Sequence, residues 1–169
     1  FFMRTLPLAG LVAGIVGLGT ISASAALSSA DRNFVDHAAS GGMAEVQTAQ
    51  LAQQRSSSPQ VKQFANRMIT DHTQANSELQ QIAEQQNITL PTQLDTKDAS
   101  EYRKLSGLNG TAFDQAYAQG AVTDHQQDIA LFRKEAQSGQ DPALKSYAQK
   151  TLPILEQHLQ LAQSLNTKR

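Results

Sequence analysis

Apolar and small side chains recur every three or four positions along four long stretches of the chain, which is the spacing of amphipathic helices. The clearest stretch covers residues 59–87, where the inward stripe consists of Val61, Phe64, Ala65, Met68, His72, Ala75, Leu79 and Ile82. Comparable stripes cover residues 29–54, 111–137 and 142–165. The pattern therefore predicts four long helices and no sheet.

Turn-forming residues separate these stretches. Ser56-Ser57-Ser58 precedes Pro59, which suits the first turn of a helix, and Ser138-Gly139 begins the turn before Pro142. About twenty residues lie between the second and third long stretches, with a short helix predicted over residues 98–105. Pro153 falls inside the last helix and is expected to kink it, because proline removes a backbone donor.

The length of the middle linker decides the predicted topology. Twenty residues are enough to run back along the bundle, so the second and third long helices are expected to be parallel. Residues 59–67 also align with residues 142–150, an offset that pairs Glu45 with Asp128. We therefore predict an all-α, ferritin-like four-helix bundle with a long crossover between helices 2 and 3, forming one domain over residues 30–166.

The first 25 residues have the features of a signal peptide. Arg4 precedes an uncharged apolar run over residues 6–21, and small residues up to Ala25 provide a cleavage site. A transmembrane anchor is the alternative, but the run is short for a membrane span. We predict cleavage after Ala25 and export to the periplasm, or to an outer-membrane association, with no stable membrane span in the mature chain.

The charge and the cysteine content of the chain exclude several kinds of partner and site. The chain of 169 residues has a formal net charge of −1, which gives no electrostatic reason to expect a nucleic-acid partner. It has no cysteine, so disulfides, thiolate metal sites and a cysteine nucleophile are excluded.

Each long helix carries one histidine. His72 and His125 lie within apolar stripes, His158 lies at the edge of one, and His37 lies on a flank. In the crossover topology the first three fall at similar heights along the bundle, with Glu45 of the first helix nearby. Imidazole and carboxylate groups that converge in a bundle core bind Zn, Fe, Mn or Cu.

The metal hypothesis has a specific weakness. Di-iron bundles place Glu-x-x-His on two helices, and no glutamate of this chain has a histidine three residues on. Asp36, Asp71 and Asp124 each precede a histidine, but adjacent helical residues point about 100° apart and would not chelate one ion together. We expect these aspartates to hydrogen-bond outward or across to another helix. The alternative is that the histidines are hydrogen-bonded core residues.

The ordered motifs resemble an exported bacterial family, domain of unknown function 4142. The matching positions are Phe34, Ala38, Gly41-Gly42, Glu45-Val46, Pro59, Val61-Lys62, Phe64-Ala65, Met68-Ile69, Asp71-His72, Phe113-Asp114, Tyr117, Val122, Asp124-His125, Leu152-Pro153, Leu155 and His158-Leu159. The resemblance implies a ferritin-like bundle outside the cytoplasm. It implies no catalytic residue, cofactor or partner.

Three functional hypotheses follow. The leading one is a non-catalytic periplasmic bundle with a binding or envelope-stress role. The second is a transition-metal-binding or redox bundle that uses His72, His125, His158 and Glu45, with His37 as an outer candidate. The third is an interaction module for another envelope protein.

Overall fold

The computed structural model describes residues 26–167, which contain five α-helices and no strand. The helices are α1 (Ser29–Arg55), α2 (Pro59–Gln86), α3 (Thr96–Ser106), α4 (Gly110–Ser138) and α5 (Pro142–Thr167). The four long helices and the short one were all predicted, and the all-α prediction is confirmed. The predicted signal peptide, residues 1–25, lies outside the described residues.

Side-chain caps fix where the first three helices begin. Ser28 accepts a hydrogen bond from the Asp31 amide of α1 at 3.1 Å, and Ser58 accepts one from the Val61 amide of α2 at 3.3 Å. Asp95 caps α3 through the Asp98 amide at 2.8 Å. These bonds satisfy backbone N–H groups that have no partner within the helix.

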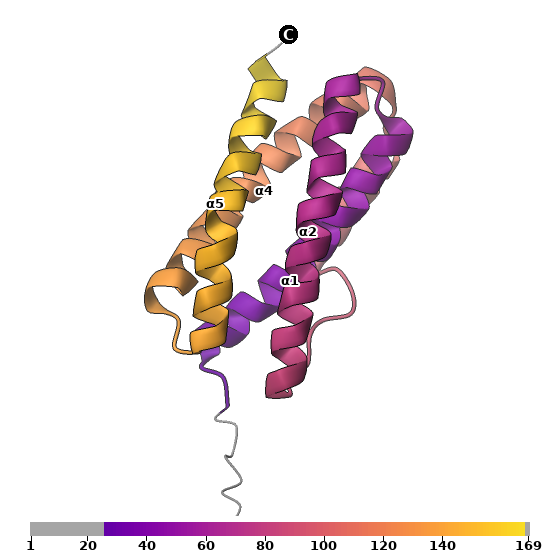
Figure 1. The fold of residues 1–169 in the computed structure, drawn as a ribbon. Helices are drawn as coiled ribbons and strands as arrows, with labels where there is room; N and C mark the ends of the chain where they lie inside the picture. The colour runs from indigo at the N-terminus through magenta and orange to yellow at the C-terminus, as the bar shows by residue number, and fades with distance from the viewer. Residues whose placement is uncertain (1–25, 168–169) are drawn as a thin grey trace, which may run out of the picture.

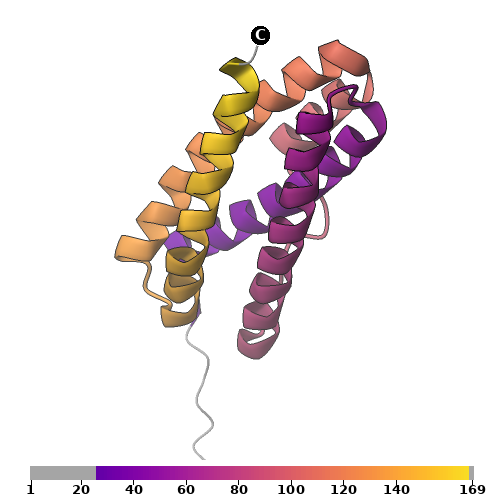
Figure 2. The ribbon, with the colours of Figure 1, turned by 45° about the horizontal axis from the view of Figure 1, so that its top comes forward.

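Helices α1 and α2 form one hairpin, and α4 and α5 form the other (Figure 1). The chain leaves the lower end of α2, runs back up along the bundle through α3, and enters α4 at the upper end. As a result α2 and α4 run in the same direction, as Figure 2 also shows. The predicted crossover is therefore present, and α3 packs against α1 and α4.

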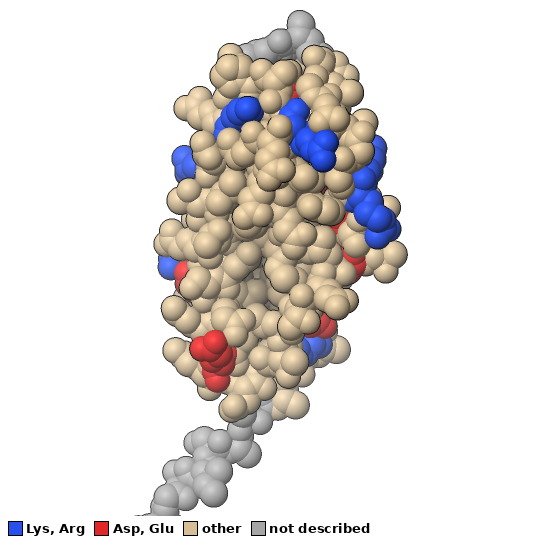
Figure 3. Space-filling view, turned by 90° about the vertical axis from the view of Figure 1, so that its right-hand side faces the viewer, with Lys and Arg blue, Asp and Glu red and all other residues tan. Residues whose placement is uncertain are grey.

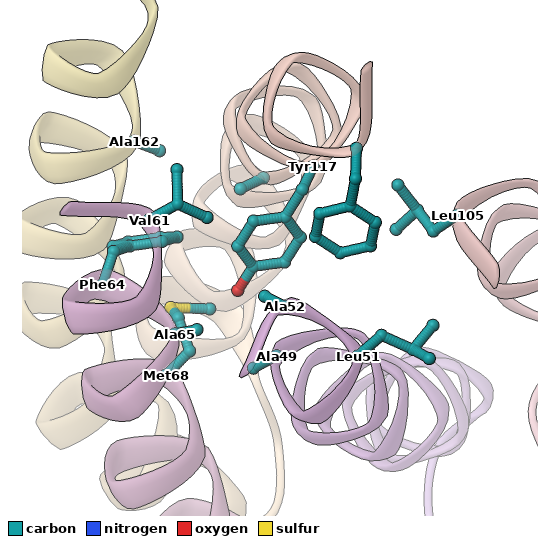
Figure 4. Close-up of a cluster of buried hydrophobic side chains, with 12 residues drawn as sticks. Ala49, Leu51, Ala52, Val61, Phe64, Ala65, Met68, Leu105, Tyr117 and Ala162 are labelled. Atoms are coloured by element: carbon teal, nitrogen blue, oxygen red, sulfur yellow. The ribbon is translucent and has the colours of Figure 1, made fainter. Parts of the chain in front are cut away.

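The core consists of two hydrophobic clusters, one toward each end of the bundle. The first cluster contains Phe64 and Met68 of α2, Tyr117 of α4 and small residues such as Ala52 of α1 (Figure 4). The second cluster contains Phe34, Leu79, Phe132, Tyr147 and Leu155. In it the Phe34 and Phe132 rings meet edge to face with centroids 4.9 Å apart, an arrangement favoured by aromatic quadrupoles.

Pro153 does not end α5, which continues through it from Pro142 to Thr167. The side chain is exposed, and its missing N–H leaves the helix without one hydrogen-bond donor. The proline thus lies within the last helix, as predicted.

The outer surface is sparsely charged on the face shown in Figure 3. Lysine and arginine lie near its upper end and along both margins, aspartate and glutamate lie mostly along the margins and in the lower half, and the middle carries neither. Within residues 26–167, no helix has both the length and the apolar character needed to cross a bilayer.

A candidate metal centre in the bundle core

A polar layer separates the two hydrophobic clusters. On each of three helices, one histidine lies between a residue of the first cluster and a residue of the second. The flanking pairs are Met68 and Leu79 on α2, Ala121 and Ile129 on α4, and Ala162 and Leu155 on α5. The apolar stripe therefore continues above and below the histidines and holds their rings at one level.

The three rings meet in the interior. His72, His125 and His158 each offer a ring nitrogen, and these nitrogens all lie within 4.8 Å of one another. His125 and His158 are completely buried, and His72 is 6% exposed. Ring centroids lie 5.3 to 5.8 Å apart. Three helices from both hairpins thus deliver imidazole groups to one point.

The Ala121 carbonyl fixes the tautomer of His125. Its oxygen lies 2.8 Å from His125 Nδ1, and a carbonyl can only accept a hydrogen bond. Nδ1 therefore carries the proton, which leaves Nε2 of the neutral ring with a free lone pair. That Nε2 faces the other histidines.

Asp71 fixes the tautomer of His158 in the same way. Asp71 Oδ2 lies 2.8 Å from His158 Nε2, and Arg67 of the same helix donates a hydrogen bond to that oxygen. Burial acts to raise the pKa of Asp71, but the hydrogen bonds from Arg67 and His158 outweigh it and lower the pKa. The ionised carboxylate can only accept, so His158 Nε2 donates and Nδ1 has the free lone pair.

The two free lone pairs face each other. His125 Nε2 and His158 Nδ1 are 3.4 Å apart, and neither nitrogen has a proton to share. Burial lowers the pKa of His158 to about 4, and it also lowers the pKa of His125. Protonating one ring would create a hydrogen bond between the two nitrogens, but the lowered pKa values make this unfavourable at neutral pH. A bound cation would instead accept both lone pairs.

His72 adds a third nitrogen that lacks a partner. Its Nε2 is buried and has no hydrogen-bond partner within residues 26–167. Burial, followed by the neighbouring His125 and His158, lowers the pKa of His72 well below its ordinary value. A neutral, buried imidazole nitrogen with a free lone pair is the form in which histidine binds a metal.

The spacing suits a tetrahedral ion. Nitrogen ligands lie about 2.0–2.1 Å from zinc, and two such ligands at a tetrahedral angle are about 3.3–3.4 Å apart. The distance between His125 Nε2 and His158 Nδ1 is 3.4 Å. The ring nitrogen that His72 offers lies within 4.8 Å of the other two, so the three could hold one ion and leave a fourth position open.

Two other predicted ligands lie elsewhere. Glu45 Oε1 is 3.5 Å from His125 Nδ1, on the side of the ring that faces away from the cluster. His37 has a side chain 55% exposed, and its Nδ1 lies 3.9 Å from Asp95 Oδ2. Neither belongs to the group of converging nitrogens, so Glu45 is placed to orient His125 rather than to share its ion.

Sequence reasoning did not find the groups that hold the rings. Asp71 was expected to bond outward or to another helix, and it does reach His158 on α5, but its partner could not be chosen from the sequence. The Ala121 carbonyl gave no signal, since backbone groups look alike in every sequence. The i, i+4 relation between Ala121 and His125 would be the only available clue.

Fold and site together define a class: an all-helical bundle with a buried three-histidine layer between two apolar clusters. The family model described as "Domain of unknown function (DUF4142)" matches residues 18–165, and the chain belongs to that family. No curated protein and no solved structure matches this chain. The ferritin-like kinship expected from the sequence therefore stays a prediction.

Proposed function

We propose that the protein is an exported binding protein whose helical core holds one transition-metal ion between His72, His125 and His158. The observation that supports this most directly is the pair of opposed lone pairs on His125 and His158, whose nitrogens lie 3.4 Å apart and whose side chains are fully buried. Export rests on the apolar run over residues 6–21 and the small residues that follow it.

The three nitrogen ligands limit which metal ions the site is expected to bind. Three neutral imidazoles suit Zn²⁺, Cu²⁺ and Fe²⁺, whereas Mn²⁺ favours oxygen ligands. Affinity at such nitrogen sites rises from Mn²⁺ through Fe²⁺ and Co²⁺ to Cu²⁺, and zinc follows copper. Zinc or copper is therefore the proposed occupant.

Chelator-treated protein should bind one Zn²⁺ by calorimetry, and Co²⁺ should give the visible absorption of a tetrahedral nitrogen site. His125→Gln and His158→Gln should each weaken zinc binding by more than the roughly 10–100-fold typical of lost supporting residues. Asp71→Asn should fall within that smaller range, because it removes only the carboxylate that orients His158.

His37→Gln is the matched control, since it removes a histidine that lies outside the cluster. It should bind zinc as tightly as the original protein. If the unmutated protein binds no stoichiometric Zn²⁺ or Cu²⁺, or if His37→Gln weakens binding as much as His125→Gln, the three-histidine site is wrong.

A further inference from the structure

The short helix α3 is held on the bundle largely by polar contacts. Leu105 is its one fully buried residue, and the side chain points into the first hydrophobic cluster (Figure 4). Nearer the start of α3, Ser40 of α1 donates a hydrogen bond to Asp98, and Lys97 Nζ lies 2.7 Å from Asp124 Oδ1 of α4. An element that buries so little apolar surface is expected to open more readily than the long helices around it.

A carboxyl group of α3 meets a carboxylate of α4 at this interface. The side chain of Glu101 shares a hydrogen bond with Asp124. The backbone of α4 leaves room for it, since a methyl group at Gly120 would overlap Glu101 Oε1. Two ionised carboxylates can only accept hydrogen bonds, so this contact requires a proton. Because Lys97 forms an ion pair with Asp124, the proton lies on Glu101.

Most of the charged groups that surround Glu101 are acidic. The ionisable residues that line the same small cavity, from α1, α3 and α4, are Glu45, Lys97, Asp98, Tyr117, Asp124 and Asp128. Lys97 and Lys104 of α3 favour the ionised form of Glu101. Burial, and then the charge of Asp124 and the hydrogen bond to it, outweigh both lysines and raise the pKa of Glu101 to about 7.

We propose that the contact between Glu101 and Asp124 is a proton-dependent switch, which docks α3 on α1 and α4 while Glu101 is protonated and releases α3 when Glu101 ionises. Ionisation removes the shared hydrogen bond and places two like charges side by side. The released helix would let solvent reach the acidic cavity beneath it. The switch does not depend on a bound metal, because the contact lies outside the group of converging histidines.

The direction of the pH dependence follows from where the proton is bound more tightly. In the docked state the pKa of Glu101 is about 7, whereas in the released helix it should return toward its ordinary value of 4.5. The contribution of this proton to docking is therefore complete below about pH 4.5, and it is lost as the pH rises through about 7.

Hydrogen exchange of the backbone amides, measured by mass spectrometry on chelator-treated protein, reports how often α3 opens. After correction for the intrinsic pH dependence of exchange, the opening equilibrium constant of α3 should rise at least about tenfold from pH 5 to pH 8. The full shift would give a larger rise, but Glu101 is only partly buried and solvent screens its charge. Amides in the middle of α5 are the internal reference and should change less.

Glu101→Gln cannot ionise and still offers a hydrogen-bond donor to Asp124. In this variant the opening of α3 should change by less than about threefold between pH 5 and pH 8. Glu84→Gln, which changes an exposed acid on α2, is the matched control and should keep the full rise. Gly120→Ala tests the contact from the other helix, because the Glu101 carboxyl would have to turn away. It should open α3 several-fold more at pH 5 and reduce the rise with pH.

Three results would overturn the switch. The first is equal opening of α3 at pH 5 and pH 8 in the unmutated protein. The second is a full rise retained by Glu101→Gln, which would assign the pH dependence to other acids of the cavity. The third is an equal rise for α3 and α5, which would mean that pH acts on the whole bundle rather than on the docking of α3.

Discussion

Several ionisable side chains of this protein are buried, and each needs hydrogen-bond partners that offset the free-energy cost of its burial. Asp31 is 1% exposed and accepts hydrogen bonds from the Gln140 and Asp141 amides at 3.0 and 3.2 Å. His125 and His158 have a carbonyl and a carboxylate on their outer nitrogens. Burying a polar group is costly unless it is hydrogen-bonded, and these partners offset the cost.

Glu135 is the buried acid with the clearest expected dependence on pH. It is 4% exposed, and burial together with the nearby Asp31 raises its pKa to about 7. The folded state therefore binds the proton more tightly than the unfolded chain, where the pKa is near 4.5. The stability that this proton contributes is complete below about pH 4.5 and is lost as pH rises through about 7.

Glu135→Gln removes this titration because the amide stays neutral. Relative to the variant, the original protein should lose free energy of unfolding, on the order of 1 kcal/mol after solvent screening, between pH 5 and pH 8. Urea denaturation at several pH values measures the difference. Parallel pH profiles for the two proteins would show that Glu135 ionises normally.

At the scale of a helix, the adjacent residues Gly41 and Gly42 in the middle of α1 lower its helix propensity, and the packing of α1 against α2 explains one of them. Each glycine costs about 1 kcal/mol relative to alanine in a helix interior. A methyl group at Gly42 would overlap the side-chain amide of Asn76 on α2, whereas one at Gly41 would lie 3.9 Å from Asp128 Oδ1. An alanine at Gly42 would therefore require the Asn76 side chain to turn away, whereas one at Gly41 would not disturb its neighbours.

The two glycines provide a matched pair. Gly41→Ala should stabilise the protein by about 1 kcal/mol, because it gains helix propensity and meets only ordinary contacts. Gly42→Ala should stabilise less than Gly41→Ala, by about 1 kcal/mol, because the end of the Asn76 side chain must first turn away. Thermal unfolding of both variants tests this, and in an Asn76→Ala background the two glycine substitutions should have equal effects. Equal effects of the two single substitutions would contradict the packing argument.

At the scale of the whole molecule, two sets of contacts join segments that are distant in the chain. The carboxylate of Asp31, near the start of α1, binds the turn between α4 and α5, more than a hundred residues away. The histidine layer joins α2 of one hairpin to α4 and α5 of the other. Such contacts contribute to stability only when both hairpins are folded and docked.

Asp31→Ala should cost about 2–4 kcal/mol of unfolding free energy, because it removes a buried side chain that accepts two part-buried hydrogen bonds from backbone amides. Asp36→Ala is the control on the same helix, since Asp36 is half exposed and lies 3.7 Å from Arg32. It should change stability by no more than about 0.5 kcal/mol. Chemical denaturation of the two variants, side by side, measures the contrast.

Removing the metal should lower the stability of the whole bundle. An ion that binds only the folded state adds about 2.7 kcal/mol when its free concentration is a hundred times its dissociation constant. Zinc should therefore raise the unfolding temperature of chelator-treated protein, and a chelator should reverse the rise. The His125→Gln variant should show no such rise. If zinc raised the unfolding temperature of both proteins equally, the ion would be acting elsewhere.

The sequence alone determined where the helices lie and at what height along the bundle three of the histidines stand. Apolar spacing, Ser58 before Pro59 and the turn before Pro142 placed each long helix within a few residues of its ends, because helix periodicity and capping are local properties. The long linker indicated the crossover. Knowing that crossover, one could place His72, His125 and His158 at one height from the helical rise alone.

Tertiary structure decided which way each polar group points and what it meets. Glu45 was expected among the metal ligands, yet it contacts the outer nitrogen of His125, and His37 lies at the surface. Asp98 and Glu101 of α3 line one small cavity together with acids of α1 and α4, and no pattern in the sequence aligns these residues with one another. Periodicity specifies a face of a helix, but the rotation and docking of that face depend on long-range packing, and hydrogen-bond partners across helices depend on both.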